Sequence, residues 1–287
     1  MKKPTRYILL AILLLGLIVW GAWENQALGR TDYTLTSQRL PDSFDGYRIV
    51  QISDLHNTRF GKNNEKLLQM VEDAQPDMIA MTGDLIDSRR TDLEIALEFV
   101  RAAVKIAPCY YVTGNHEIRD KEYGALEQEM EKLGVTVLRG EKAEVTRGTD
   151  KICILGVDDC TEVVTDNPKY EKDRRDWDEI QNEVMEIMLE PIAVSEFNIL
   201  LSHRPDSFPV FCRYGVDLAL TGHNHGGQIR IPGLGGLYAS EDLFPEYDEG
   251  MFSQGNTTMI VSRGLGNSLF PFRVNNRPEI VVVTLHK

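Results

Sequence analysis

The chain has 287 residues, 42% of them hydrophobic and 26% charged, which is typical of a globular protein and long enough for one large α/β domain with a buried core. Its formal net charge of −13 argues against non-specific binding to nucleic acid and against a broad electrostatic grip on anionic lipid, because both need a basic face. An anionic substrate would have to be held locally, for example by bound cations.

An apolar segment opens the chain. Basic residues in positions 1–6 precede a charge-free run from Tyr7 to Trp23, YILLAILLLGLIVWGAW. A helix of about 17 residues spans about 25 Å, near the lower limit for crossing a bilayer. We expect residues 7–23 to be an uncleaved, single-pass transmembrane anchor in the cell membrane, with a secretory signal peptide as the alternative. The basic residues predict that residues 1–6 are cytoplasmic and that the following domain is extracytoplasmic.

The next segments read as a tether and the first half of a layered domain. Residues 24–46 are predicted to be a polar tether with a first strand, and residues 47–287 to be the main domain. Strand-like runs at 48–52, 77–81 and 109–112 alternate with helical stretches near 64–74 and 92–105. This alternation predicts an α/β sheet whose functional edge lies at the carboxyl ends of its strands.

The second half contains further apolar runs and one charged segment. We expect runs 135–138 and 151–155 to form a meander that builds the second half of a sandwich. Residues 161–190 are predicted to be a solvated helix, with a partner surface or a substrate cap as the alternative. Further strands are expected at 197–201, 216–220, 258–261 and 279–285.

Polar residues suited to metal binding follow five of the apolar runs. Only one of the six histidines, His286, lacks such a setting. The candidates are Asp54, His56, Asp84, Asn115, His116, His203, His223 and His225. Carboxylate, amide and imidazole donors suit Mn²⁺, Fe or Zn²⁺ better than calcium. They are too many for one ion, so we expect two divalent metal ions that share one carboxylate and lie about 3.5–4 Å apart.

Cysteine has no part in this expected site. The four cysteines contain no C-x-x-C pair, which disfavours a thiolate zinc site or a redox motif. We expect buried strand residues, with a Cys153–Cys160 disulfide as the alternative.

The polar blocks resemble a known family. Asp54-x-His56, Gly83-Asp84, Gly114-Asn115-His116-Glu117, His203 and Gly222-His223-x-His225 resemble the five blocks of the calcineurin-like metallophosphoesterase superfamily, in the family's order. The apolar leader and the Gly-His-x-His-Gly-Gly-Gln stretch are similar to the membrane-associated bacterial branch typified by YkuE and YaeI. This resemblance implies a four-layer α/β/β/α sandwich of two mixed β-sheets flanked by helices.

The resemblance also implies a role for each block. One metal would be held by Asp54, His56, Asp84 and His225, and the other by Asp84, Asn115, His203 and His223. His116 would not be a ligand; it would act as general acid or stabilise the phosphoryl transition state. Glu117 would orient its neighbours. Arg59, Arg89, Arg90 and Arg204 are candidates for phosphate contacts, with solvated surface positions as the alternative.

The function that follows is a membrane-anchored phosphoesterase with a binuclear metal centre. We expect hydrolysis of phosphodiesters or of lipid- or envelope-linked phosphates by attack of a hydroxide that bridges the metals. The second block departs from the Gly-Asp-x-x-Asp-Arg-Gly pattern of protein phosphatases, because its arginine, Arg89, is displaced by one residue. The alternatives are a pyrophosphate hydrolase of a nucleotide-linked glycolipid and an inactive, metal-binding interaction scaffold.

Overall fold

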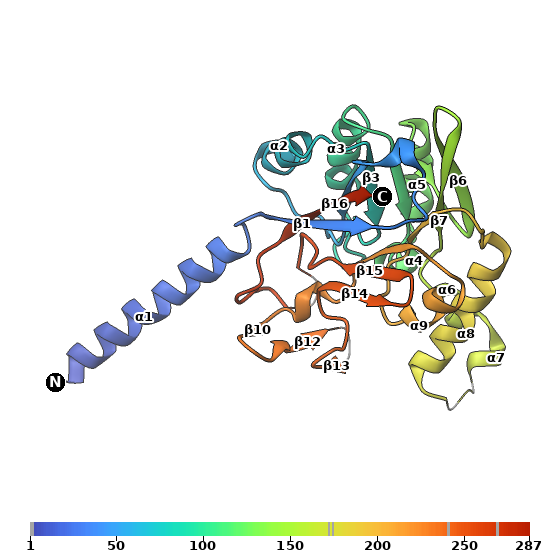
Figure 1. The fold of residues 1–287 in the computed structure, drawn as a ribbon. Coiled ribbons are helices and arrows are strands. Elements are labelled where there is room, and N and C mark those ends of the chain that lie inside the picture. The colour runs from blue at the N-terminus through green and yellow to red at the C-terminus, as the bar shows by residue number, and fades with distance from the viewer. Residues whose placement is uncertain (1–2, 172, 174, 240–241, 268–269) are drawn as a thin grey trace.

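Two six-stranded mixed sheets pack face to face in this protein, with helices on their outer faces (Figure 1). The computed structural model describes residues 3–171, 173, 175–239, 242–267 and 270–287.

The first sheet carries the N-terminal half of the domain and the C-terminal strand. Its strands lie in the order β1 (Gly29–Thr36), β16 (Glu279–His286), β2 (Arg48–Ile52), β3 (Met78–Thr82), β4 (Cys109–Val112) and β5 (Thr136–Val137). Strands β2 to β5 are parallel, whereas β16 runs antiparallel to β2. The carboxyl ends of β2, β3 and β4 therefore meet at one edge.

The second sheet is also mostly parallel. Its order is β14 (Gly250–Gln254), β15 (Thr257–Val261), β9 (Leu218–Thr221), β8 (Asn198–Leu201), β7 (Asp150–Gly156) and β6 (Glu141–Arg147). Strands β7, β8, β9 and β15 are parallel, and the edge strands β6 and β14 are antiparallel to their neighbours.

The predicted meander over 135–138 and 151–155 is wrong. Residues 136–137 form β5, which joins the first sheet parallel to β4, and the second run pairs with β8 in the other sheet. The reason is the helix α5 (Tyr123–Lys132), which lies between β4 and β5 and makes a parallel crossover, the usual route between neighbouring parallel strands.

Three apolar layers hold the sandwich together. Ile49, Met78, Ile199 and Leu218 are fully buried between the two sheets. Helices α2 (Glu65–Asp73), α3 (Leu93–Ala103) and α5 cover the outer face of the first sheet, and α8 (Trp177–Leu189) and α9 (Phe208–Arg213) cover that of the second. Every residue of β3, β8, β9 and β15 is buried because both faces of these strands are covered. The predicted α/β fold with two mixed sheets flanked by helices is confirmed.

The charged segment 161–190 differs from the expected single solvated helix. It forms α6 (Thr161–Asp166), α7 (Pro168–Glu171) and α8, with residues 172 and 174 outside the described part. Helix α8 is amphipathic and buries Met185 and Leu189 against the second sheet. The charges lie on its other face.

Two short hairpins lie at the end of the domain near α1 (Figure 1). One pairs β10 (Arg230–Ile231) with β11 (Gly235–Gly236), and the other pairs β12 (Tyr238–Ala239) with β13 (Asp242–Leu243). The cysteines are all free, so the alternative disulfide between Cys153 and Cys160 does not form.

The N-terminal helix α1 (Lys3–Glu24) extends away from the body of the domain (Figure 1). In the part of the chain that the structure describes, no helix is both long and apolar enough to cross a membrane. A spanning anchor over residues 7–23 is therefore not confirmed. Residues 1–2 of the predicted cytoplasmic end lie outside the described residues.

Candidate metal centre

The candidate ligands all follow the carboxyl ends of strands. Asp54 and His56 come after β2, Asp84 after β3, and Asn115 and His116 open the short helix α4 (Asn115–Arg119) after β4. In the second sheet, His203 follows β8, and His223 and His225 follow β9. Because these ends meet where the sheets face each other, residues from both sheets gather in one buried group.

The backbone of this group is held in an unusual conformation. Five of the predicted ligands have positive φ, namely Asp54 at 53°, His56 at 43°, Asp84 at 53°, His223 at 69° and His225 at 47°. Positive φ is uncommon for residues other than glycine and persists only where surrounding structure enforces it. Strain of this kind concentrates at functional sites.

Two glycines allow the loops that carry the candidate ligands to pack closely against one another. A Cβ on Gly222 would lie 2.0 Å from Ser53 Oγ and 2.3 Å from Asp54 Oδ2. A Cβ on Gly114 would lie 2.2 Å from Asp84 Oδ1. Both separations are far inside van der Waals contact, so only glycine fits at these positions.

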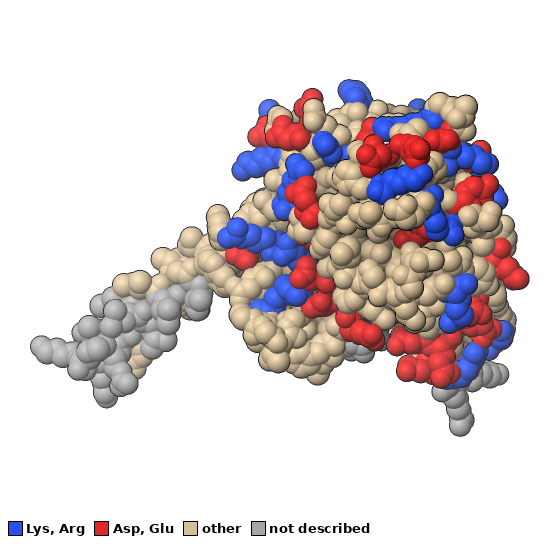
Figure 2. Space-filling view, viewed as in Figure 1, with Lys and Arg blue, Asp and Glu red and all other residues tan. Residues whose placement is uncertain are grey.

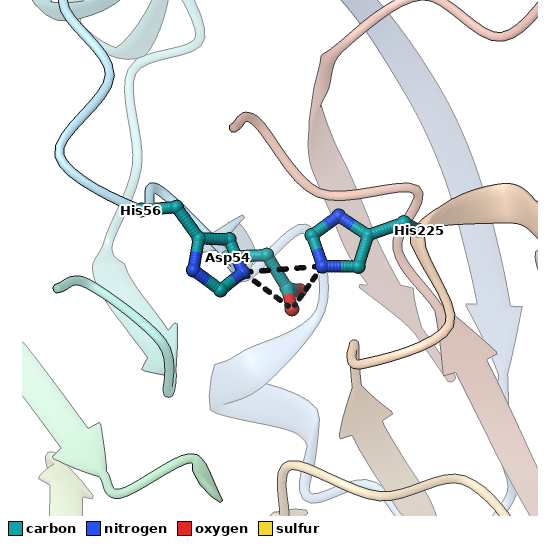
Figure 3. Close-up of side chains that lie close together, drawn as sticks. All are labelled: Asp54, His56 and His225. Atoms are coloured by element: carbon teal, nitrogen blue, oxygen red, sulfur yellow. Dashed lines mark hydrogen bonds and ion pairs between the residues drawn. The ribbon is translucent and has the colours of Figure 1, made fainter. Parts of the chain in front are cut away.

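One set of donor atoms converges between β2 and β9 (Figure 3). The side chains of Asp54, His56 and His225 point toward one another. The two histidine Nε2 atoms are 3.1 Å apart, and His225 Nε2 is 3.4 Å from Asp54 Oδ1. Two nitrogens that each lie 2.0–2.1 Å from one ion in tetrahedral geometry are about 3.3 Å apart, so this set has the dimensions of a metal site.

A second set lies between β3 and β8. His203 Nε2 is 3.1 Å from His223 Nδ1 and 3.3 Å from Asp84 Oδ2. The same Asp84 Oδ2 is 3.5 Å from His56 Nε2, which belongs to the first set. One carboxylate oxygen therefore faces both sets of donors.

Asn115 adds a buried acceptor. Among the described residues, its side-chain Oδ1 is buried and has no hydrogen-bond partner. A buried polar atom without a partner is rare in proteins, and a cation bound to this oxygen would satisfy it. The donor atoms of the site therefore fit divalent metal ions on chemistry as well as on spacing.

The charges of the site separate its histidines into two kinds. Burial lowers the pKa of His56 to about 3 and lowers that of His225 well below its ordinary value, so both rings are neutral. His203 differs, because Asp84 outweighs burial and raises its pKa to about 10. Burial raises the pKa of Asp54 to about 6. The proton on His203 balances the Asp84 carboxylate, and a metal ion bound at His203 would replace this proton.

His116 lies beside His56 and Asp84, close enough for these three side chains to share an ion, and it also faces Asp87. Its ring packs edge-on against His56, with centroids 4.6 Å apart. The Ser88 N–H lies 3.1 Å from His116 Nδ1 and suits the neutral ring, whereas Asp87 Oδ1 at 3.5 Å suits the protonated ring. Burial opposes protonation, but Asp87 and Asp84 outweigh it and raise the pKa of His116 above its ordinary value.

Glu117 ties the loops together. Its fully buried carboxylate accepts hydrogen bonds from the backbone N–H groups of Asp84 at 2.7 Å, Gly114 at 2.8 Å and Ile86 at 3.1 Å. Burial raises its pKa to about 7. It lies behind the donor group, as expected for a residue that orients its neighbours.

Two buried arginines contact the outer nitrogens of the paired histidines. Arg204 Nη1 lies 2.9 Å from His223 Nε2, and Asp159 holds this arginine, with Oδ2 at 2.8 Å from Arg204 Nε. Arg273 is fully buried, and its Nη2 lies 3.3 Å from His225 Nδ1. Burial lowers the pKa of Arg273 to about 10. Sequence reasoning missed Arg273, because it lies 48 residues from His225 in a loop with no metal-binding pattern.

A cavity of about 560 Å³ opens over the donor group. Asp84, Asn115 and His116 form part of its wall. Among the arginines considered for phosphate contact, Arg89 and Arg204 line this cavity. Arg59 is paired with Glu98 at 2.8 Å and does not line it, and neither does Arg90. Arg119, which the sequence did not single out, also lines the cavity.

Comparison with known proteins gives matches that agree with one another, because the matching family model and relatives are all described as phosphoesterases. Residues 47–227 match a family model described as calcineurin-like phosphoesterase. The chain is 32% identical over 269 residues to the uncharacterized metallophosphoesterase YkuE of Bacillus subtilis, which covers 91% of this chain and 87% of that protein. It is 26% identical over 258 residues to the phosphodiesterase YaeI of Escherichia coli, with 85% and 84% covered.

Two further matches are more partial. A transmembrane protein with metallophosphoesterase domain from Danio rerio is 27% identical over 262 residues, covering 88% of this chain but 56% of that protein. Among solved structures, TT1561 of Thermus thermophilus has a TM-score of 0.48 at 15% identity and covers 77% of this chain and 90% of that one.

Proposed function

The chain belongs to the calcineurin-like phosphoesterase family of metal-dependent phosphoester hydrolases, and from this premise we propose that it hydrolyses phosphodiesters at a two-metal centre. The preference for diesters is supported by the Escherichia coli relative, which is named a phosphodiesterase.

The observation that carries the two-metal proposal is the position of Asp84. Its Oδ2 atom lies 3.5 Å from His56 Nε2 and 3.3 Å from His203 Nε2, between two sets of donors. We assign one ion to Asp54, His56, Asp84 and His225, and the other to Asp84, Asn115, His203 and His223. The oxygen and imidazole donors suit Mn²⁺, Fe or Zn²⁺.

Two bound divalent ions would lower the pKa of water and offset the charge of a phosphate during an in-line displacement. The protein's own residues position the predicted ligands and the loops that carry them. Arg204 and Arg273 lie against the outer nitrogens of His223 and His225, and Glu117 fixes the loops that carry Asp84 and Gly114. Such preorganised charges and ligands need no rearrangement during the reaction.

We assign His116 the role of proton donor to the leaving-group oxygen. It lines the cavity beside Asp84, and its pKa is raised despite burial because Asp87 and Asp84 favour the protonated ring. A general acid must carry its proton before the reaction, and acid catalysis of this kind contributes about 10²–10⁴-fold to the rate.

The test is turnover of bis(p-nitrophenyl) phosphate by the purified chain with Mn²⁺. We expect His116→Ala to lower kcat about 10²-fold or more while the metal content stays unchanged. His286→Ala is the matched control. His286 lies near the C-terminus, contacts Asp45 and does not line the cavity. Equal rates for wild type and His116→Ala would contradict the role of His116, and loss of metal would mean that His116 is a ligand.

We further propose that α1 attaches the domain to a membrane. Support comes from the charge-free run between Tyr7 and Trp23 and from exposed apolar side chains on the helix, such as Ile12 at 61% and Val19 at 61%. The Danio rerio relative is named a transmembrane protein. Recovery of the full chain in the soluble fraction of lysed cells, without detergent, would contradict this attachment.

A further inference from the structure

Exposed apolar side chains concentrate in two loops beside the cavity. Among the described residues, seventeen large hydrophobic side chains are exposed; eight belong to α1, and six of the other nine lie in the two hairpins β10–β13, just after them, or in the loop at 270–272. We call this group the apolar rim: Leu234, Tyr238, Leu243, Phe244, Phe270 and Phe272. In Figure 2 the lobe that carries β10 to β13 shows a largely uncharged surface, whereas charges of both signs crowd the opposite end of the domain. Contiguous apolar surface of this kind marks interaction sites.

The rim is continuous with α1. A Cβ on Gly21 of α1 would lie 3.5 Å from Phe272 Cδ1, so Phe272 packs against this helix. Asn25, just after α1, donates to the Pro271 carbonyl oxygen at 2.7 Å and accepts from the Arg273 N–H at 2.8 Å. The helix and the Phe270–Phe272 loop are therefore held together, and an apolar medium that covers the end of α1 would also meet the rim.

The rim is also continuous with the cavity. Tyr238 and Phe270 line the cavity, whose other wall carries Asp84 and His116. Phe270 and Phe272 contact each other edge-on, with ring centroids 6.3 Å apart. On the side next to α1, the path to the donor group is thus apolar at the mouth and polar at its base, whereas Arg89 and Arg119 line other parts of the cavity. An amphiphile matches this gradient, with its phosphate at the base and its chains at the mouth.

We propose that the apolar rim docks on a lipid bilayer and that the cavity takes an amphiphilic phosphoester from it. This deepens the proposed function and rests on it. Binding depends on insertion of apolar side chains, because a protein of net charge −13 gains nothing from anionic lipid. Docking should therefore occur on zwitterionic phosphatidylcholine vesicles, which carry no net charge, and persist at high salt.

The first experiment measures docking without turnover. Leu243→Cys, in the full chain with Cys212→Ser, is labelled with an environment-sensitive fluorophore and mixed with phosphatidylcholine vesicles. Leu243 is 70% exposed, so the label is accessible. We expect a blue shift that persists in high salt. The matched control is Ile187→Cys, 55% exposed on α8 away from the rim, which should show no shift. No blue shift of the label at position 243, or equal shifts at both labelled positions, would overturn the proposal.

The second experiment separates access from chemistry. Leu234→Glu/Leu243→Glu is compared with Ile187→Glu/Met251→Glu, in which the replaced side chains are also exposed but lie outside the rim. The substrates are hexadecyl p-nitrophenyl phosphate in phosphatidylcholine vesicles and bis(p-nitrophenyl) phosphate in solution. We expect the rim variant to lose about ten-fold or more on the vesicle substrate, because two leucines no longer insert, and to keep its rate on the soluble ester.

The outcomes distinguish this proposal from the proposed function. An unchanged rate on vesicles, or equal losses on both substrates, would overturn membrane delivery. A wild-type chain that docks on vesicles but hydrolyses neither ester with Mn²⁺ would instead contradict the phosphoesterase function, because the fluorescence readout needs no catalysis.

Discussion

Asp159 and Arg204 form a buried ion pair behind His223, with the Asp159 side chain fully buried and that of Arg204 8% exposed. Removing one partner of such a pair leaves an uncompensated buried charge, which destabilises more than loss of the contact alone. At the scale of single residues, the site therefore depends on a buried charge pair that lies behind a predicted ligand. Arg273, which is fully buried and contacts His225, is a second buried charge beside a predicted ligand.

We expect Asp159→Asn to lower the free energy of unfolding by about 3–5 kcal/mol at pH 6, because Arg204 stays buried without its partner. Burial disfavours the Asp159 carboxylate, but Arg204 outweighs it and lowers its pKa below the ordinary 3.8. A lowered folded-state pKa contributes stability above the unfolded pKa and loses it as pH falls. The difference between wild type and variant should therefore shrink below about pH 4.

Urea unfolding between pH 3 and pH 6 measures this dependence. Asp42→Asn is the matched control, because the Asp42 side chain is 82% exposed and its removal should change stability little. A wild-type–variant difference that stays constant down to pH 3 would contradict the assigned role of the pair.

At the scale of elements, the loops after the strands are the functional units. They are joined to one another by backbone hydrogen bonds, such as those from Asp54 N to the Gly83 carbonyl oxygen at 3.0 Å and from Gly222 N to the His203 carbonyl oxygen at 2.9 Å. Five predicted ligands keep positive φ within these loops. A change that separates two loops should therefore disturb the ligands before it disturbs the sheets.

Gly222→Ala tests this closeness. The added Cβ would lie 2.0 Å from Ser53 Oγ, so the loops after β2 and β9 must separate. We expect a stability loss of about 1–3 kcal/mol and a fall in kcat of roughly 10- to 100-fold on bis(p-nitrophenyl) phosphate. Gly124→Ala is the control, because no atom lies within 4 Å of its added Cβ on helix α5. Full activity of Gly222→Ala would show that the loops tolerate separation.

At the scale of the whole molecule, the donor group joins the two sheets. Asp54, His56, Asp84 and Asn115 come from the first sheet, and His203, His223 and His225 from the second. Bound metal ions would therefore link the two halves of the sandwich. The stability of the fold should therefore depend on bound metal more strongly than it would if all the ligands came from one sheet.

Removal of metal by chelation should lower the melting temperature by roughly 5–10 °C, since a ligand at a hundred times its Kd stabilises a fold by about 2.7 kcal/mol. Differential scanning calorimetry with and without Mn²⁺ measures this shift. Asp84→Asn should lose most of it, because Asp84 faces both sets of donors. A wild-type melting temperature that changes neither with Mn²⁺ nor with chelator would contradict a metal centre at this position.

Much of the fold was predictable because its signals are local. The runs at 48–52 and 109–112 coincide with β2 and β4, and the predicted helices overlap α2 and α3 within one or two residues at each end. Apolar periodicity acts over a few residues and survives in the folded protein. The predicted meander is wrong because β5 and β7 belong to different sheets. The crossover helix places β5 beside β4, and β7 pairs with β8, which is distant from it in sequence.

The sequence by itself determined which residues could bind metal. Ligand chemistry resides in side-chain type, and a strand followed by a polar loop places Asp54 or His203 at a sheet edge whatever the rest of the chain does. The resemblance already implied that Asp84 is shared by two metals. Only the tertiary structure decided that Arg273 contacts His225, and that Phe272 and Phe270 together link α1 to the cavity. These contacts join segments far apart in the chain, and they exist only once both sheets have packed.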